Sequence, residues 1–473
     1  MRRVLKISEN DFEKVRRLLL ADLPRESAAF LLVGWSSLRG QEAFLVRRVV
    51  EIPKDQFTVQ ESYRLGVSSR AINGIIALCE GNALGVVLCH NHPDTTPYSA
   101  SDDFGEKRVA ETIWTFLPAV PVGSLLLRPD GPQGRAWLPN PTRAVDLNEI
   151  VVIGRSVWRH PLGSNGNGAV HIDHEIYDRQ VAVLGEKGQQ KISSARVAVV
   201  GVGGTGSATA EQLVRLGAKD IVLVDNDVFS PSNKSRLYGS FEAHARHSWY
   251  AFWERNRPKV AVVANHLRKI QSALKIRTYA AHVAATEACR SLLDRDVIFL
   301  CTDDHWGRSV VNQVAYQYLI PVINMGVRID SDNGKITEAV ASVHILRPEK
   351  PCLWCSNYLR AEQIQAESLP ETERHALERE GYVQGLDMRA PSVISFTTWV
   401  SAIATSLFIQ LMTDFMGVQG DLARVNVFFN ECATRRGTCQ VLPDCICTKV
   451  KGFGDCRPLP TVASPQLPRR SRR

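Results

Sequence analysis

The chain of 473 residues lacks a run of about 18 consecutive apolar residues, the length that a helix needs to cross a bilayer. Its first residues become acidic at Glu9, before an apolar signal-peptide core develops. The longest apolar stretch, from Val393 to Met416, is interrupted by serine, threonine, glutamine and aspartate, which favours a buried or amphipathic helix. We therefore expect a cytoplasmic protein with no membrane partner.

The chain also lacks a strong excess of charge. Its 57 lysine and arginine residues and 49 aspartate and glutamate residues give a net charge of +8, and four of the arginines stand among the last five residues. The body of the chain is thus nearly neutral, which gives no support for a nucleic-acid partner. With 44% hydrophobic and 22% charged residues the composition is that of a globular protein, and the length predicts two to four domains of roughly 100–200 residues.

Cysteine, at 11 residues, is too sparse for the disulfide scaffold of a small secreted protein. Four cysteines stand apart, whereas the others crowd the C-terminal third: Cys352, Cys355, Cys432, Cys439, Cys445, Cys447 and Cys456. In a cytoplasmic protein such crowding favours metal binding over disulfide bonds.

A flexible segment divides two differently patterned regions. Residues 163–168 are Gly-Ser-Asn-Gly-Asn-Gly, and we predict a linker over residues 158–175. Residues 1–157 are predicted to form one domain and residues 176–457 a second. Residues 458–473, rich in proline and arginine, are predicted to be a basic disordered tail.

Hydrophobic periodicity predicts an α/β fold for both regions. In the first region it predicts helices at Glu9–Leu20 and near Ser68–Glu80, and strands at Ala28–Val33, Ala43–Val50, Gly85–Cys89 and Ser124–Leu127. The second region alternates strands and helices, which predicts a Rossmann-like, mostly parallel sheet. Its predicted elements are strands Arg196–Val200, Asp220–Val224, Val297–Leu300 and Val322–Asn324, and helix Ala208–Leu216.

A glycine-rich turn stands between the first strand and the first helix of the second region. It contains Gly201, Gly203, Gly204 and Gly206, and glycines let the backbone approach a phosphate at a helix N-terminus. Asp225, at the end of the next strand, is placed to accept hydrogen bonds from ribose hydroxyls. The turn and the acid together predict a nucleotide site.

The residues that follow separate the classes of nucleotide enzyme. In order they are Asp225-Asn226-Asp227, Asn233-Lys234-Ser235-Arg236, Pro258-Lys259, and Cys301-Thr302-Asp303-Asp304 with Arg308 and Asn312. From about Tyr177 to Cys447 this order resembles the ThiF/MoeB/ubiquitin-activating superfamily of adenylating enzymes. A nicotinamide oxidoreductase has no use for these charged residues.

The resemblance implies a site for ATP and magnesium in a homodimer. Its residues would be Asp225 and Asp227 for the ribose, Arg236 and Lys259 for the triphosphate, Asn233 as a further cofactor-binding residue, Asp303 for magnesium, and Arg179, which would reach the ATP of the partner subunit. A departure from the family is the tryptophan-containing stretch 241–257, which is longer than the usual link to the lysine.

Two cysteine pairs, Cys352 with Cys355 and Cys445 with Cys447, stand where members of this family often bind structural zinc. The second pair has one residue fewer between its cysteines than expected, so Cys439 or Cys456 could complete the site instead. Family members that form a thioester usually carry a nucleophilic cysteine between the two pairs, but residues 356–430 contain none, and Cys432 is the nearby thiol. We therefore expect adenylation without a thioester step.

The first region carries a second set of chemical groups. His90-Asn91-His92-Pro93, followed by Asp102, offers three zinc ligands and leaves a fourth position open, as in catalytic zinc sites. The pattern resembles the JAMM/MPN (JAB) metallopeptidases. This resemblance implies that Glu26 is the general base and that Ser99 stabilises the oxyanion. The spacing leaves open whether Asp102 or Asp103 is the ligand.

Together the two resemblances imply a bifunctional bacterial enzyme. Its second domain would adenylate a ubiquitin-like protein ending in glycine, and its peptidase domain would trim that protein or cleave its conjugates, with a conjugating enzyme as a further partner. Similar fusions are encoded in bacterial operons, some of them in antiphage defence. The alternatives are a sulfur-carrier adenylyltransferase with a carrier-processing peptidase, and a non-catalytic scaffold that binds ubiquitin-like proteins.

Overall fold

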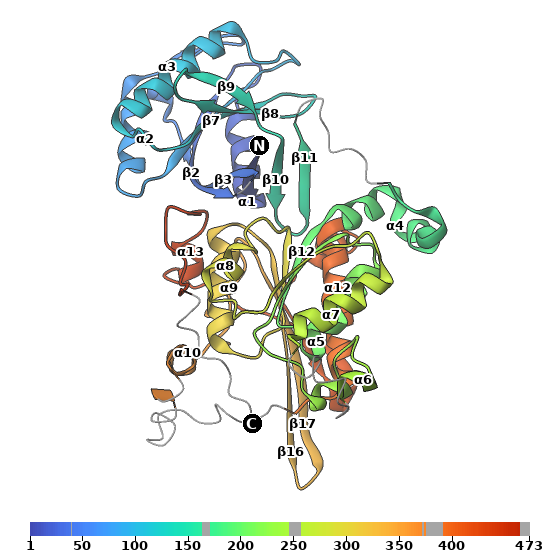
Figure 1. The fold of residues 1–473 in the computed structure, drawn as a ribbon. Coiled ribbons are helices and arrows are strands. Elements are labelled where there is room, and N and C mark those ends of the chain that lie inside the picture. Colours follow the sequence, from blue (N-terminus) through green and yellow to red (C-terminus); the bar gives the residue numbers. More distant parts are fainter. Residues whose placement is uncertain (39, 163–170, 246–256, 371–372, 375–390, 464–473) are drawn as a thin grey trace. The chain divides into compact units, whose positions relative to one another are not determined.

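The computed structural model describes residues 1–38, 40–162, 171–245, 257–370, 373–374 and 391–463 (Figure 1). Parts of the predicted linker (163–170), of the tryptophan-containing stretch (246–256), of the segment between the cysteine pairs (371–372, 375–390) and of the tail (464–473) lie outside these ranges. The chain forms two compact units. Unit 1 comprises Met1–Ala169, Gln317–Leu319 and Val450–Pro458; unit 2 comprises Val170–Tyr316, Ile320–Lys449 and Leu459–Arg473.

Unit 1 is built on a nine-stranded mixed sheet with the order β11-β10-β1-β3-β2-β6-β7-β8-β9. Its strands are β1 (Arg2–Ser8), β2 (Ala28–Leu38), β3 (Gln41–Glu51), β6 (Gly85–Asn91), β7 (Val122–Leu127), β8 (Gln133–Leu138), β9 (Arg143–Asp146), β10 (Glu149–Ile153) and β11 (Val157–Pro161), with β4 (Phe57–Gln60) and β5 (Leu65–Val67) forming a separate hairpin. Its helices are α1 (Glu9–Leu20), α2 (Ser69–Glu80) and α3 (Ala100–Phe116).

Both faces of this sheet are covered. Successive residues of β2 point to opposite faces, and they belong to two different hydrophobic cores. Leu31 belongs to a cluster with Val15 of α1, whereas Phe30 belongs to a cluster with Ile75 of α2 and Ile113 of α3. α1 therefore covers one face, and α2 and α3 cover the other. The end of β6 and the start of α3, which carry the predicted zinc ligands, meet at the edge of this second layer.

Unit 2 is built on an eight-stranded sheet with the order β14-β13-β12-β15-β16-β17-β18-β19. The parallel strands are β12 (Arg196–Val200), β13 (Asp220–Val224), β14 (Lys275–Tyr279), β15 (Val297–Leu300) and β16 (Val322–Asp332); the antiparallel strands are β17 (Lys335–Leu346), β18 (Arg424–Phe428) and β19 (Ala433–Gly437). The helices are α4 (His174–Ser194), α5 (Gly204–Arg215), α6 (Glu242–Ala245), α7 (Lys259–Ile270), α8 (Thr286–Arg290), α9 (His305–Gln317), α10 (Ala361–Ser368), α12 (Ile394–Thr413) and α13 (Ile446–Lys449). Figure 1 shows α8 and α9 on one face of this sheet and α5, α7 and α12 on the other.

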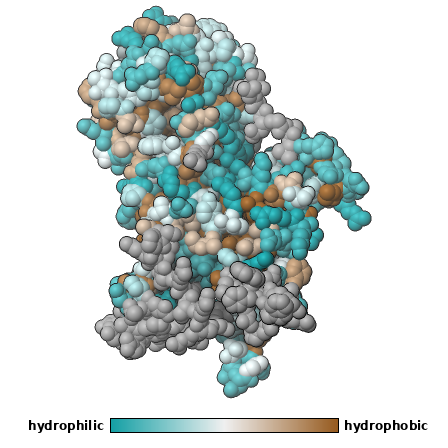
Figure 2. Space-filling view, viewed as in Figure 1, coloured by the Kyte–Doolittle hydropathy of each residue, from teal (hydrophilic) through white to brown (hydrophobic). Residues whose placement is uncertain are grey.

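The predicted Rossmann-like sheet is confirmed for β12, β13 and β15, whose bounds are those expected. The predicted strand Val322–Asn324 is too short. In the structure β16 continues to Asp332, and Asn333 and Gly334 connect it to β17. These two residues have φ angles of 48° and 77°, typical of a two-residue hairpin turn. The end of the hairpin is exposed and hydrophilic (Figure 2), so no apolar pattern marks it in the sequence.

The long apolar segment forms α12. By length and composition this helix could cross a membrane, but half of its most apolar window is buried within the structure. It packs against α5 and β16, as expected of a core helix.

Residues 450–458 belong to unit 1, although the sequence places them directly after the last zinc-pair cysteine. Phe453 is buried in the core formed with α2 and α3. The backbone N–H of Gly34 donates to the carbonyl of Gly452 at 3.0 Å, and a Cβ on Gly34 would lie 2.3 Å from that oxygen. Only glycine at position 34 permits this close pairing. In the predicted tail, Val462 pairs with Ala285 of unit 2.

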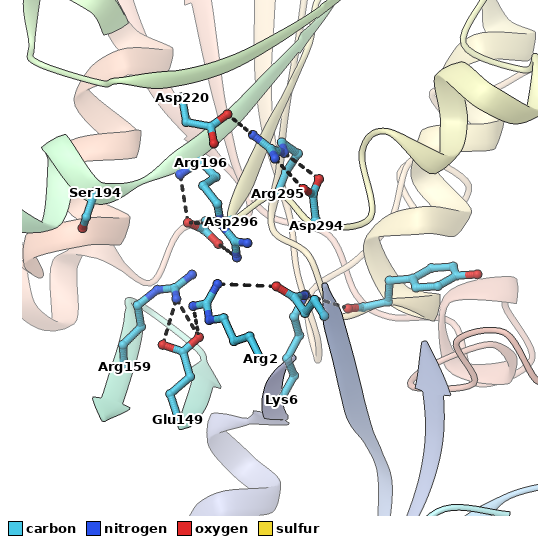
Figure 3. Close-up of polar contacts among 12 residues, drawn as sticks. Arg2, Lys6, Glu149, Arg159, Ser194, Arg196, Asp220, Asp294, Arg295 and Asp296 are labelled. Carbon is cyan, nitrogen blue, oxygen red and sulfur yellow. Dashed lines mark hydrogen bonds and ion pairs between the residues drawn. The ribbon is translucent and has the colours of Figure 1, made fainter. Parts of the chain in front are cut away.

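Ion pairs join the amino ends of the parallel strands in unit 2 (Figure 3). Arg295 is 2% exposed and bonds Asp220, the first residue of β13, at 2.6 Å and Asp294 at 2.6 Å. Arg196, the first residue of β12, pairs with Asp296 at 2.8 Å. This edge is opposite the carboxyl ends, where a parallel sheet binds ligands, so we assign these pairs to stability.

We expect Arg295→Ala to destabilise unit 2 by about 3–5 kcal/mol, because Asp220 and Asp294 are left without their buried counter-charge. Arg277→Ala is the matched control. Arg277 also contacts Asp294, at 3.3 Å, but its side chain is 49% exposed, so a loss below about 1 kcal/mol is expected. Urea unfolding of both variants measures the difference, and equal losses would refute this assignment.

Candidate functional site

The glycine turn of unit 2 brings three segments into close contact. Gly201 has a φ of 83°, and a Cβ there would lie 2.6 Å from the backbone nitrogen of Thr302. A Cβ on Gly206 would lie 1.8 Å from the carbonyl oxygen of Gly201. α5 begins at Gly204, four residues earlier than predicted, and its N-cap residue, Gly203, has no side chain that could cap the first turn. The uncapped N–H groups suit a phosphate.

Asp225 and Asp227 lie beside this turn at the end of β13. The backbone N–H groups of Val202 and Asp227 donate to Asp225 at 2.7 and 2.8 Å, which fixes its carboxylate against the turn. Burial raises the pKa of Asp225, and the charge of Lys259 opposes the rise. Lys259, the first residue of α7, donates to Asp227 at 2.7 Å. The structure thus brings the lysine to the predicted nucleotide site despite the long preceding segment.

The Asn-x-x-Arg element forms a short 3-10 helix, η2 (Pro231–Ser235). The side-chain oxygen of Asn233 accepts from the backbone N–H of Ser230 at 2.9 Å, so this oxygen shapes the turn. Arg236 follows the turn and donates to the carbonyl of Ser232 at 3.0 Å. Arg179 is exposed on α4, and in the described part of the chain it contacts none of the other predicted nucleotide residues.

Asp303 and Asp304 follow β15 and have different surroundings. Asp304 is buried and accepts from His282 at 3.0 Å and from Thr302 and the backbone of Gly307, so it caps α9. Burial works to raise its pKa, but these contacts hold the pKa well below its usual range. Asp303 is exposed at the carboxyl edge of the sheet, and its carboxylate suits magnesium.

The two cysteine pairs come together in unit 2. The Sγ atoms of Cys352, Cys355, Cys445 and Cys447 all lie within 4.8 Å of one another. The distance is 3.4 Å from Cys352 to Cys445 and 3.7 Å from Cys355 to Cys447. Tetrahedral zinc with Zn–S bonds of about 2.3 Å places sulfur atoms about 3.8 Å apart. The hydrogen bond to Cys352 and burial raise the pKa of Cys447, and a bound cation would favour the thiolate instead.

The other C-terminal cysteines lie outside this group. Cys439 donates to the carbonyl of Cys355 at 3.1 Å, and Cys456 donates to the carbonyl of Ala83 in unit 1 at 3.2 Å. Cys432 is exposed. The spacing of Cys445 and Cys447 therefore closes a four-sulfur site without either substitute.

The second candidate site lies in unit 1. His90 is the second-last residue of β6, His92 follows the strand, and Asp102 lies in the first turn of α3. The Nε2 atoms of His90 and His92 lie 3.6 and 3.4 Å from the two carboxylate oxygens of Asp102. Zinc ligands at about 2.0–2.2 Å from the metal lie about 3.3 Å apart. The Nε2 of His90 is buried and has no hydrogen-bond partner among the described residues, so all three side chains fit a zinc ion.

Electrostatics favours metal binding by these residues. Burial lowers the pKa of His90 to about 4, which leaves the ring neutral. Burial works to raise the pKa of Asp102, but His92 and His90 hold it well below its usual range. The Nδ1 of His92 lies 2.8 Å from the carbonyl of Thr96, which orients its Nε2 toward the site.

Glu26 lies beside the three predicted ligands. Ala28 pairs with His90 across β2 and β6, and this register brings the Oε1 of Glu26 to 3.8 Å from the Nε2 of His92. Burial raises the pKa of Glu26 to about 7, with His92 opposing and Asp102 adding to the rise. A carboxylate with a pKa near neutrality suits a general base.

Ser99 and Asp103 have other contacts. Ser99 is the N-cap of α3, and its hydroxyl donates to Asp102 at 2.7 Å. The serine predicted for the oxyanion therefore orients a ligand in this structure. Asp103 pairs with Arg135. Of the two aspartates left open by the sequence, Asp102 is the one that lies with the histidines.

Sequence reasoning missed Glu106, one turn after Asp102 on α3. Its Oε2 accepts from Arg135 Nη2 at 2.8 Å and from Trp137 Nε1 at 3.1 Å, while its Oε1 lies 3.7 Å from the Nδ1 of His90. A carboxylate behind a histidine ligand orients the ring. The four-residue spacing from Asp102 is the available signal, and it is also common on exposed helix faces.

Comparisons with known proteins concern the second region. Residues 177–447 match the ThiF family. The sulfur carrier protein ThiS adenylyltransferase of Bacillus subtilis is 29% identical over 183 residues, which cover 38% of this chain and 49% of the relative. The molybdopterin-synthase adenylyltransferase of Escherichia coli is 27% identical over 188 residues, which cover 39% of this chain and 69% of the relative. The chain thus spans about half the length of the Bacillus relative.

A solved structure is similar at lower identity. The crystal structure of E. coli MccB with ATP is 16% identical, with a TM-score of 0.44, and covers 58% of this chain and 74% of that chain. The family match covers more than half of the chain. It includes the glycine turn, the aspartates after β13 and β15, and the four clustered cysteines. The protein therefore belongs to the ThiF family through the Rossmann-like α/β domain of unit 2.

Proposed function

We propose that the protein adenylates the C-terminus of a ubiquitin-like or sulfur-carrier protein that ends in glycine. The single observation that carries the proposal is the gathering of backbone N–H groups, a lysine and carboxylates at the carboxyl edge of the sheet in unit 2. There the uncapped first turn of α5 follows β12, Asp227 with its partner Lys259 follows β13, and the exposed Asp303 follows β15. These three strands are neighbours in the sheet. The ThiF match and the names of the curated relatives support the same chemistry.

In the proposed reaction a substrate carboxylate oxygen attacks the α-phosphorus of ATP, and the bond between that phosphorus and the oxygen bridging to the β-phosphate breaks. Pyrophosphate leaves, and the carboxyl group becomes an acyl adenylate. The α5 N–H groups and Lys259 would hold the phosphates, with Arg236 close by, and Asp225 and Asp227 would hold the ribose. A magnesium ion held by Asp303 would neutralise charge on the triphosphate.

Exchange of labelled pyrophosphate into ATP tests this proposal. The full chain is mixed with ubiquitin-fold proteins that end in Gly-Gly, and with the same proteins lacking the final glycine. We expect exchange only with the complete carriers. If ATP binds and no carrier supports exchange, the non-catalytic scaffold that binds ubiquitin-like proteins becomes the better account.

Partners and assembly follow from this proposal. Exposed Arg179 on α4 is suited to reach the ATP of a second copy, so we infer a homodimer. With no cysteine between residues 356 and 430, transfer without a thioester is favoured, and a conjugating enzyme would then accept the acyl adenylate directly. A cytoplasmic, bacterial setting and a place in antiphage defence remain predictions.

We infer a second activity, zinc-dependent peptide or isopeptide hydrolysis by unit 1. The observation that favours it is the convergence of His90, His92 and Asp102 within 4.8 Å, with Glu26 beside them. A bound zinc ion would polarise the scissile carbonyl. Glu26 would take a proton from the attacking water and pass it to the leaving amine. JAMM-type trimming of a carrier precursor, or cleavage of its conjugates, fits this arrangement.

Zinc content provides an independent prediction. We expect about two zinc ions per chain by mass spectrometry of the native protein. Cys352→Ser should remove the zinc of unit 2 and His92→Ala that of unit 1, each leaving about one ion. Cys432→Ser is the matched control for the first variant, because Cys432 is exposed and lies outside the cluster. A wild-type content of one would eliminate one of the two sites.

A further inference from the structure

Arg308, on α9, is a buried cation that forms no ion pair with the described residues. The residue is 8% exposed, and its Nε has no hydrogen-bond partner. The carboxylate of Asp304 accepts from His282, Thr302 and the backbone of Gly307, and it forms no ion pair with Arg308. A buried charge without a partner is costly. The arrangement therefore calls for an anion from outside the chain.

The neighbouring His344 does not supply that anion and is itself affected by the cation. Burial, with the charges of Arg424 and Arg308, lowers the pKa of His344 to about 3. Its ring therefore adds no charge that would balance Arg308.

Other unsatisfied polar atoms lie near Arg308. Asn324 of β16 faces His344 of β17, with 3.3 Å between Nδ2 and Nδ1, so the amide donates to the ring and the ring N–H is on Nε2. In the described part of the chain, His344 Nε2 and Asn324 Oδ1 are buried without partners. The Tyr358 ring joins the groups, at 4.8 Å from the His344 ring and 4.9 Å from the Arg308 guanidinium carbon.

This pocket lies at the same sheet edge as the glycine turn. Asn324 pairs with Leu300 at the end of β15, and Thr302 lies against Gly201. Gly326 keeps the approach to the guanidinium open. A Cβ at this position would lie 2.3 Å from the Tyr358 hydroxyl and 3.1 Å from Arg308 Nη2. The pocket thus offers a cation, a neutral donor and an acceptor beside the expected phosphate position.

We propose that Arg308, Asn324 and His344 bind the C-terminal carboxylate and the last peptide group of the protein substrate, an assignment that rests on the proposed adenylation. Arg308 and His344 donate to the terminal oxygens, and Asn324 Oδ1 accepts from the last peptide N–H. A phosphate of ATP would satisfy Arg308 equally well, but it carries no donor for Asn324. A peptide end satisfies all three residues.

Binding calorimetry tests this assignment. The full chain, saturated with a non-hydrolysable ATP analogue, is titrated with a ubiquitin-fold protein ending in Gly-Gly, prepared as the C-terminal acid and as the C-terminal amide. We expect the wild type to bind the acid about 10- to 100-fold more tightly than the amide. Arg308→Gln should erase this preference and leave affinity for the ATP analogue within about twofold. A general loss of structure would change both affinities together.

Two further variants complete the test. Arg360→Gln removes an exposed charge near His305 and should keep the full preference for the acid. If Arg308→Gln does not fold, Arg308→Lys keeps the charge without the planar fork and should retain only part of the preference. A full preference in the Arg308 variants, or a loss confined to the ATP analogue, would overturn the assignment. Wild-type protein that binds neither carrier form would instead contradict the proposed function.

Discussion

Asp303→Asn is expected to lower the rate of carrier-dependent pyrophosphate exchange by about 100- to 1,000-fold. Asp303 is the exposed carboxylate at the end of β15, next to the glycine turn, and the amide would hold magnesium much less well. Asp304 beside it is buried and caps α9, so the loss should be specific to position 303. Initial rates of exchange under saturating ATP measure the effect.

Asp330→Asn is the matched control for this variant. Asp330 is an exposed acid on β16 that pairs with Arg328 at 3.2 Å, away from the sheet edge that holds the glycine turn. Its exchange rate should stay within about twofold of wild type. Full exchange in Asp303→Asn would remove this residue from the adenylation site, and an equal loss in both variants would point to a general effect of surface charge.

Glu26→Gln is expected to lower peptide or isopeptide hydrolysis by about 100- to 10,000-fold, because the amide cannot accept the proton of the attacking water. The zinc content should remain about two per chain, since the ligands of unit 1 are His90, His92 and Asp102. Cleavage of a carrier extended beyond its Gly-Gly end, followed by mass spectrometry, measures the rate.

Glu61→Gln controls for the loss of an acid near Glu26. The carbonyl of Glu61 accepts the backbone N–H of Glu26 at 2.8 Å, and this contact does not depend on the Glu61 side chain. The variant should cleave at the wild-type rate. Rapid cleavage by Glu26→Gln would exclude Glu26 as the base, and loss of zinc would indicate that it helps to bind the metal.

Periodicity predicted the elements that carry the nucleotide site. The buried parallel strands β12, β13 and β15 consist of short apolar runs, and glycines, aspartates or cysteine follow them directly. Since parallel strands end at one edge, the chain order already indicated that Gly201, Asp225 and Asp303 would gather there. The antiparallel β17–β19 were missed because their exposed ends lack an apolar pattern.

Contacts between distant segments were beyond the reach of the sequence. Phe453 follows the zinc-pair cysteines by only a few residues, yet it packs in the core of unit 1. Glu106 reads as an ordinary charged helix residue, and Arg308 belongs to the family-like order of residues, but only the fold reveals that each is buried. Local hydrogen bonding also changed two predicted roles: Ser99 orients Asp102, and the side-chain oxygen of Asn233 shapes its own turn.

Label transfer from ATP to a carrier tests the central claim most directly. The full chain is incubated with magnesium and a ubiquitin-fold protein ending in Gly-Gly, using ATP labelled at the α-phosphate or at the γ-phosphate. Adenylation predicts that the α-label appears on the carrier, that the γ-label leaves in pyrophosphate, and that the carrier without its last glycine stays unlabelled. Transfer of the γ-label to the carrier, or release of ADP without any labelled carrier, would contradict the account.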